Sequence, residues 1–166
     1  MAWVRILVGA VWLNGAIEKF LNPEFPQQLA TSLNAGGFVS QAPSWFQDFM
    51  RGTVVPNVEL FAQFQRFGEL ALGLALILGL LTNPAAIGSL VLSLTILISQ
   101  GGVRLGTGLG SPEFLNVDLF IALISLVILL SPAAKMLSLD AALVRRRPSL
   151  APLLLNRRMG RRRSRV

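Results

Sequence analysis

Four long hydrophobic segments run through the chain, and turn-forming residues separate them. They cover residues 2–21, 58–82, 85–100 and 116–131, and an Asn-Pro or Ser-Pro pair closes three of them. Apolar segments of about 20 residues are typical of membrane-spanning helices, and a Pro takes the chain out of a helix. The pattern predicts an all-α integral membrane protein in which residues 1–144 form one bundle of four spans.

The connection between the first two predicted spans, residues 22–57, has a different character. It is polar and aromatic, and Pro, Gly and Asn recur throughout, so it cannot cross a membrane. Its segment SWFQDFMR places Trp45, Phe46 and Phe49 together on a short amphipathic turn. This turn either lies at the membrane interface or packs on the bundle as a solvent loop. Connections of this length are often binding elements.

The overall composition agrees with a membrane protein. Hydrophobic residues make up 53% of the chain and charged residues 14%, and the mean hydropathy is +0.62. An ordinary soluble domain is less apolar and more highly charged. We therefore expect a multi-pass protein of the cell membrane.

The net charge of +7 is concentrated at one end of the chain. Residues 1–144 carry six basic and eight acidic groups, whereas nine arginines lie between Arg145 and Arg165. We interpret residues 145–166 as a basic tail that is disordered or lies on anionic lipid, and not as a nucleic-acid-binding surface. The positive-inside rule places this tail in the cytoplasm, and four spans then place the N-terminus there too.

The chain contains neither Cys nor His. A thiolate nucleophile is therefore excluded, as are the usual protein ligands of haem and copper. We predict no metal site and no covalently bound cofactor, so a redox role would depend on a borrowed cofactor such as a quinone.

Polar side chains within the predicted spans, or close to their ends, gather near the outer, non-cytoplasmic face. This topology brings eight of them to one depth: Glu18, Lys19, Gln63, Arg66, Glu69, Gln100, Arg104 and Asp118. The inner half is nearly all aliphatic, and Arg5 is expected to extend from it toward the interface.

Charges at this depth are costly unless they are paired or face a bundle interior. Lys19 and Arg66 can be balanced by Glu18, Glu69 and Asp118, and the choice of partners stays open. One interpretation is a network that only fixes the register of the helices. The other is a pocket, apolar at depth and polar at its mouth, that suits a quinone or a lipid head group.

Three stretches resemble the DoxX family of small four-helix membrane proteins, which includes the DoxD subunit of thiosulfate:quinone oxidoreductase. They are WLNGAIEKFLNP, FGELALGLALILGLLTNPAAI and SPAAKMLSLDAAL. By position, the resemblance implies that Lys19 and Glu69 are the matching charges within the membrane. It also implies that Ser138, Leu139 and Asp140 match the cytoplasmic end. The long 22–57 connection and the basic tail depart from the family pattern.

The resemblance and the polar residues together predict a membrane subunit that serves a redox complex or handles a quinone-like molecule. It would be at most a non-autonomous subunit of an oxidoreductase. The alternative is a non-catalytic scaffold that docks a partner through its outer connection or its basic tail. A small transporter or channel is disfavoured because the polar residues stop halfway across the membrane. The expected partners are membrane lipids and a second protein or a second copy of the chain.

Overall fold

The structure is a computed structural model, and it describes residues 1–34, 37–102, 116–135 and 137–146. Every regular element in these residues is helical, which confirms the prediction of an all-α fold. The α-helices are α1 (Ala2–Leu21), α2 (Phe25–Leu33), α3 (Ser44–Phe49), α4 (Val58–Leu78), α5 (Thr82–Ser99), α6 (Val117–Leu130) and α7 (Leu139–Arg146). Short 3₁₀ or π segments are η1 (Phe38–Gln41), η2 (Met50–Val54), η3 (Val55–Asn57) and η4 (Pro132–Lys135).

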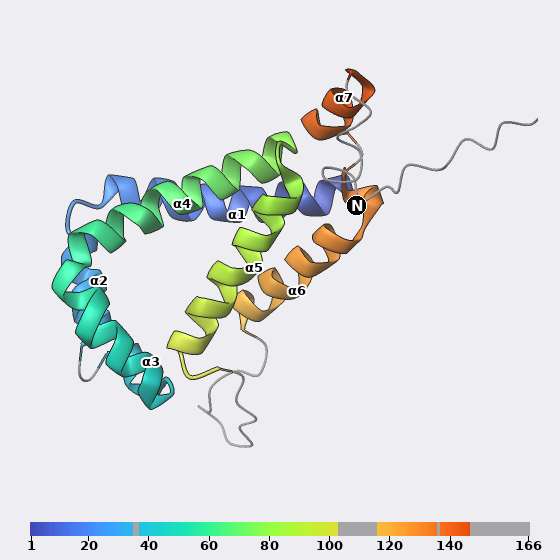
Figure 1. The fold of residues 1–166 in the computed structure, drawn as a ribbon. Coiled ribbons are helices and arrows are strands. Elements are labelled where there is room, and N and C mark those ends of the chain that lie inside the picture. Colours follow the sequence, from blue (N-terminus) through green and yellow to red (C-terminus); the bar gives the residue numbers. More distant parts are fainter. Residues whose placement is uncertain (35–36, 103–115, 136, 147–166) are drawn as a thin grey trace, which may run out of the picture.

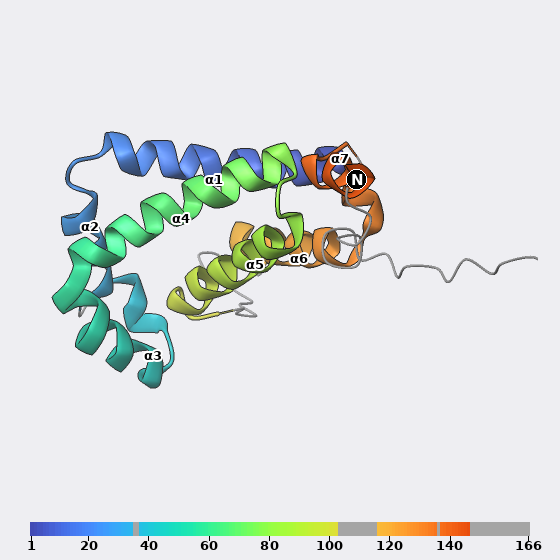
Figure 2. The same ribbon diagram turned by 45° about the horizontal axis from the view of Figure 1, so that its top comes forward.

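The long helices form two pairs that diverge from one end of the molecule. Helices α1 and α4 lie side by side, and so do α5 and α6 (Figures 1 and 2). The turn between α4 and α5 joins the pairs at the end where α7 and the N-terminus lie (Figure 1). Helices α2 and α3 lie at the other end of α1 and α4, where the two pairs are furthest apart (Figure 1).

Small residues bring α1 and α4 into close contact. A Cβ atom placed on Gly9 would lie 2.9 Å from the carbonyl oxygen of Gly73, and one placed on Gly73 would lie 2.8 Å from the amide nitrogen of Leu13. Ala16 and Ala62 on the same helices are fully buried. Helices with small residues at their interface can bring their backbones together in this way. This close contact fixes the position of α1 along the axis of α4.

The end of α4 differs from the predicted helix over residues 58–82. Helix α4 ends at Leu78 because Gly79 takes the left-handed conformation (φ 67°), and the amide of Leu80 then bonds to the carbonyl of Ala75 over 2.9 Å. This pattern closes helices at a glycine. The predicted Asn-Pro turn is also wrong, since Asn83 and Pro84 lie in the first turn of α5. Pro is tolerated there because the first amides of a helix have no partner within it.

The 22–57 connection is mostly helical, whereas the sequence predicts only a short amphipathic turn within it. Its own small core is formed by Leu33, Val39, Ala42, Phe46, Met50 and Val54. Phe46 is buried in that core, whereas Trp45 and Phe49 are exposed, so the three aromatic side chains do not share one environment. The connection is therefore a folded unit, and α2 packs on α4.

Within the described residues, α5 alone has the length and composition of a helix that can cross a membrane. Helix α6 is also apolar, but it is shorter. The four-span bundle and the cytoplasmic placement of both termini therefore stay predictions. Residues 147–166 of the predicted tail and Arg104 lie outside the described residues, while Arg145 and Arg146 belong to the last turn of α7.

Candidate functional site

A lysine and a glutamate meet where α1 and α4 pack together. The Lys19 Nζ atom donates to Glu69 Oε2 over 2.8 Å and to the carbonyl oxygen of Gly15 over 3.3 Å. Gln65 Nε2 donates to the other carboxylate oxygen of Glu69 over 3.1 Å. Glu69 is only 1% exposed, and both of its oxygens have a donor. We call Lys19, Gln65, Arg66 and Glu69 the Lys19 cluster.

Arg66 connects this cluster to the end of α1. Its Nε and Nη2 atoms donate to the carbonyl oxygens of Lys19 and Asn22, over 2.9 and 2.7 Å. Its guanidinium also lies over the rings of Phe20 and Phe25, at 5.9 and 5.4 Å from their centres. Cations favour the carbonyl end of a helix and the faces of aromatic rings. Arg66 therefore closes the end of α1, while Lys19 forms the ion pair with the carboxylate.

A second polar group lies where α5 ends and α6 begins. Gln100 Nε2 donates to Asp118 Oδ2 over 3.2 Å, and Asn116 Nδ2 donates to Gln100 Oε1 over 2.5 Å. The Asn116 side chain also accepts from the backbone amide of Asp118 over 2.8 Å, which caps α6. These three residues, the Asp118 cluster, join the two helices of the second pair.

A cavity of about 1030 Å³ lies between the helix pairs and the 22–57 connection, and both clusters line it. Lys19, Gln65 and Glu69 reach it from α1 and α4, and Gln100 and Asp118 reach it from α5 and α6. Most of the remaining lining is apolar: Trp12, Leu33, Met50, Val54, Phe61, Leu72, Leu92, Ile96 and Ile121. The cavity is therefore an apolar space with two polar regions on its walls.

The rim of the cavity is apolar. All of the exposed residues that line it are hydrophobic: Val11, Phe49, Phe64, Ala71, Val91 and Val117. Its polar lining residues are partly or fully buried instead. The polar groups therefore lie on the buried walls of the cavity, whereas the predicted pocket has them at its mouth.

Not every predicted polar residue belongs to these clusters. Glu18 is exposed on α1, and Gln63 is half-buried on α4, and neither lines the cavity. Sequence reasoning overlooked Gln65, although its spacing of four residues from Glu69 was a usable signal, because side chains at that spacing are neighbours on a helix.

The described residues contain no group of acidic side chains that could hold a metal ion.

A different polar region lies where α7 meets the start of α5. Asp140 is fully buried, and its two carboxylate oxygens accept from the amides of Leu81 and Thr82 over 2.8 and 2.7 Å. Its own amide donates to the carbonyl oxygen of Gly79 over 2.9 Å. A carboxylate on the first amides of a helix satisfies unpaired donors and complements the helix dipole. Asp140, which the family resemblance singles out, thus caps α5.

Arg5 is fully buried beside this cap, which corrects the prediction that it extends to an interface. Its Nη2 atom donates to the carbonyl oxygen of Leu137 over 3.1 Å, and its Nη1 atom occupies the space where a side chain on Gly79 would lie. Nε and Nη1 find no hydrogen-bond partner within the described residues. The predicted aliphatic half of the molecule therefore contains buried charges. We call Arg5, Gly79, Leu137 and Asp140 the Asp140 cluster.

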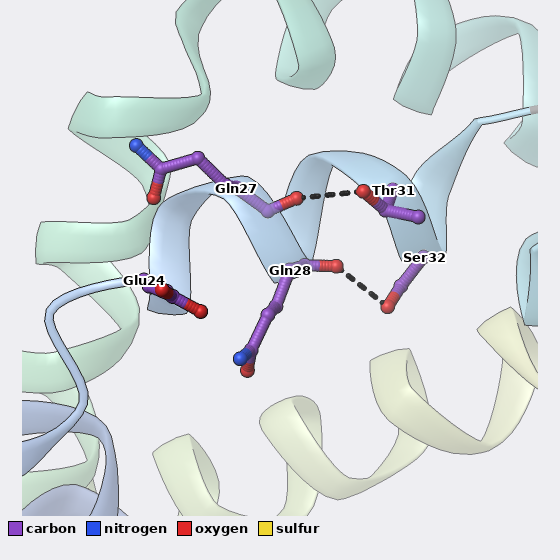
Figure 3. A pocket seen from close by; sticks show the side chains of 5 residues that line it. All are labelled: Glu24, Gln27, Gln28, Thr31 and Ser32. Atoms are coloured by element: carbon purple, nitrogen blue, oxygen red, sulfur yellow. Dashed lines mark hydrogen bonds between the residues drawn. The ribbon is translucent and has the colours of Figure 1, made fainter.

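A hollow of about 610 Å³ on α2 is lined only by polar side chains: Glu24, Gln27, Gln28, Thr31 and Ser32 (Figure 3). The hydroxyls of Thr31 and Ser32 donate to carbonyls of their own helix, over 2.9 and 2.8 Å (Figure 3). Apart from partly buried Ser32 its residues are exposed, so water competes for the remaining polar groups. The cavity between the helix pairs combines volume, burial and charge, and the hollow on α2 does not.

The comparisons with known proteins give one match. The model of a family described as TQO small subunit DoxD matches residues 1–154. This range contains all three stretches that carry the resemblance, and it contains every residue of the three clusters. No curated protein and no solved structure matches the chain.

Proposed function

Because this chain belongs to the DoxD family, the small subunits of thiosulfate:quinone oxidoreductase, we propose that it is a membrane-embedded subunit whose cavity binds a quinone-like molecule. Membership confirms the resemblance to the DoxX family, and it supports the assignment to a membrane-associated redox complex. It also supports a protein partner, since a small subunit works with others. The ligand, its site and the number of membrane spans are our proposals.

The surface of the helix pairs supports a multi-pass arrangement. Large apolar side chains are exposed along α1, α4 and α6, among them Trp3, Leu7, Phe64, Phe67, Leu123 and Leu126. Soluble monomers rarely expose so much apolar surface, whereas lipid covers it at no cost. We propose that α1, α4, α5 and α6 cross the membrane. The arginines at the end of α7 favour a cytoplasmic placement of that end.

The Lys19–Glu69 ion pair on the cavity wall is the observation that carries the ligand proposal. The Lys19 side chain is 22% exposed and that of Glu69 is 2% exposed, so the ammonium is the more accessible partner. Lys19 and Gln65 can each donate to a carbonyl oxygen of a quinone, and Glu69 can hold or release a proton beside it. Reduction of a quinone to a quinol takes up two electrons and two protons. We propose that a partner subunit supplies both electrons, that the two protons come from water, and that Glu69 relays them to the quinone oxygens.

Quinone binding by the purified chain tests this proposal. The full chain in lipid nanodiscs would be titrated with a benzoquinone that carries a decyl tail. We expect Glu69→Gln to weaken binding about 10-fold or more, because it removes the ion pair from the cavity wall. Glu18→Gln is the matched control, since it removes an exposed carboxylate outside the cavity and should leave the affinity unchanged. Absent binding, or equal affinity of the Glu69→Gln variant, would refute the proposal.

The second candidate, a scaffold that docks a partner through the 22–57 connection, also has an observation in its favour. The connection is a folded unit, and Trp45 on its surface is 63% exposed. Exposed tryptophans are frequent anchors of protein interfaces. Co-purification of partner proteins with the wild-type chain and with Trp45→Ala would distinguish the candidates. Loss of the partner with quinone binding intact would assign docking to the connection.

A further inference from the structure

Gly68 lies in the middle of α4 and lines the cavity, yet none of the described helices packs against it. A Cβ atom placed on Gly68 would meet no atom within 4 Å, whereas one placed on Gly9 or Gly73 would lie closer than 3 Å to the neighbouring helix. Glycine is among the least favourable residues inside a helix. Helix packing explains Gly9 and Gly73, but it does not explain Gly68. The glycine leaves an open, flat stretch of backbone on the cavity wall.

This open stretch adjoins the polar groups of the Lys19 cluster. Gly68 directly precedes Glu69, and it follows Gln65 by three residues, which places Gln65 and Gly68 on neighbouring parts of the helix surface. Glycine permits a ligand to approach the backbone more closely than any other residue does. A ring that lies against Gly68 would therefore have its edge within reach of the polar side chains beside it.

The charges on the cavity wall indicate which ligands are favoured. The charged side chains that line it are Lys19, Glu69 and Asp118, and the lysine is already paired with Glu69. A lipid phosphate would bring further negative charge beside two carboxylates, which is unfavourable in an apolar space. An uncharged ring with polar oxygens avoids this repulsion.

Building on the proposed function, we propose that Gly68 is the specificity-determining position of the cavity. The flat, uncharged ring of the ligand lies against it, with a ring oxygen toward Gln65 and Lys19, and an apolar tail leaves through the hydrophobic rim. The ligand class is a planar quinone with a hydrocarbon tail, and it enters from the lipid instead of from water.

Tryptophan fluorescence provides a local measure of binding. Trp12 lines the cavity, and the chain has two other tryptophans, Trp3 and Trp45. In the full chain with Trp3→Phe and Trp45→Phe, the decyl-tailed benzoquinone should quench Trp12. We expect Gly68→Leu to fill the open stretch and weaken binding about 10-fold or more. Gly52→Leu is the matched control, because a Cβ there also meets no atom within 4 Å but Gly52 lies outside the cavity.

Two further measurements test the inference independently of the Gly68→Leu variant. Gly68→Ala adds one methyl group, so it should raise the melting temperature, because alanine favours a helix, and weaken binding less than leucine does. If Gly68→Leu does not fold, an unchanged affinity of Gly68→Ala overturns the inference. Dodecyl phosphate, an anionic probe with a similar tail, should not compete with the quinone, and efficient competition would overturn the preference for an uncharged ring.

The outcomes separate this inference from the proposal on which it rests. Wild-type affinity in the folded Gly68→Leu variant, with binding still lost in Glu69→Gln, would overturn the role of Gly68 and leave the proposed function standing. If the quinone does not quench Trp12 in the chain that carries only Trp3→Phe and Trp45→Phe, both the role of Gly68 and the proposed function are overturned. A benzoquinone without a tail should bind more weakly, and equal affinity would overturn entry through the apolar rim.

Discussion

The Lys19 cluster and the Asp140 cluster both bury charged side chains of α1, but at opposite ends of that helix. In the Lys19 cluster, the Glu69 carboxylate accepts from the side chains of Lys19 and Gln65, and these three residues line a cavity. In the Asp140 cluster, the bonds of Arg5 and Asp140 go to backbone groups of the α4–α5 turn and the segment before α7. Side chains that bond to backbone hold helix ends in place, and Arg66 does this within the Lys19 cluster as well. The Lys19–Glu69 pair beside the cavity, by contrast, can change partners when a ligand binds.

The largest expected effect follows from removal of the Asp140 carboxylate. Asp140→Ala leaves the amides of Leu81 and Thr82 without their acceptor and removes a negative charge that acts on buried Arg5. Breaking a buried set of this kind destabilises a protein by about 3–5 kcal/mol. Thermal unfolding of the detergent-solubilised chain would measure the loss. Asp48→Ala, at an exposed position, is the control, and equal melting temperatures for the two variants would contradict the structural role.

An intermediate effect is expected when the ion pair of the Lys19 cluster is replaced as a whole. Lys19→Met combined with Glu69→Leu exchanges two paired charges for apolar side chains, which leaves stability unchanged or raises it by about 1–4 kcal/mol when the new residues pack well. Quinone affinity should nevertheless fall about 10-fold or more, which equals about 1.4 kcal/mol. Unfolding and quinone titration of the same preparation would separate the two quantities. A large loss of stability with unchanged quinone binding would show that the Lys19 cluster stabilises the fold and does not bind the ligand.

The smallest effect concerns the polar contact between the helix pairs. Trp12 Nε1 donates to Ser89 Oγ over 2.6 Å, and Ser89 is also bonded to Ser125 over 2.7 Å. Trp12→Phe removes the first bond but leaves Ser89 a partner, so we expect a loss of about 1 kcal/mol from that hydrogen bond. Because Trp12 lines the cavity, quinone affinity should also change slightly. Denaturant unfolding would measure the difference, and a loss as large as that of Asp140→Ala would show that this contact contributes as much to stability as the cap of α5 and would contradict the expected order.

The sequence predicted the parts of the fold that depend on local patterns. Helix α1 has the predicted bounds, and α6 lies within its predicted segment, because apolar runs and the following Pro act within a few residues. Sorting the polar residues by depth placed Lys19 and Glu69 in one group, and the structure joins them in an ion pair. The assignment of the predicted cluster as a ligand site stays a prediction.

The sequence could not show contacts that depend on distant backbone. Asp140 bonds to amides rather than to a complementary side chain, and Arg5 lies 135 residues away from it, so no charge pattern connects them. Most of the helices in the 22–57 connection were missed for a related reason. Its Pro and Gly residues favour turns locally, but burial of Val39, Phe46 and Met50 in a shared core outweighs that preference.

The cap on α5 also affects the order in which the protein can mature. Thr82 precedes the carboxylate that completes its helix by 58 residues. At a synthesis rate of about 5–20 residues per second, α5 therefore exists for roughly 3–12 s before Asp140 is made. During that interval α1, α4 and α5 can already pack together. The Asp140 cap at the start of α5, where the helix pairs diverge, has not yet formed. A nascent chain that stalls before α7 would carry the complete Lys19 cluster and still lack the cap that fixes where α5 begins.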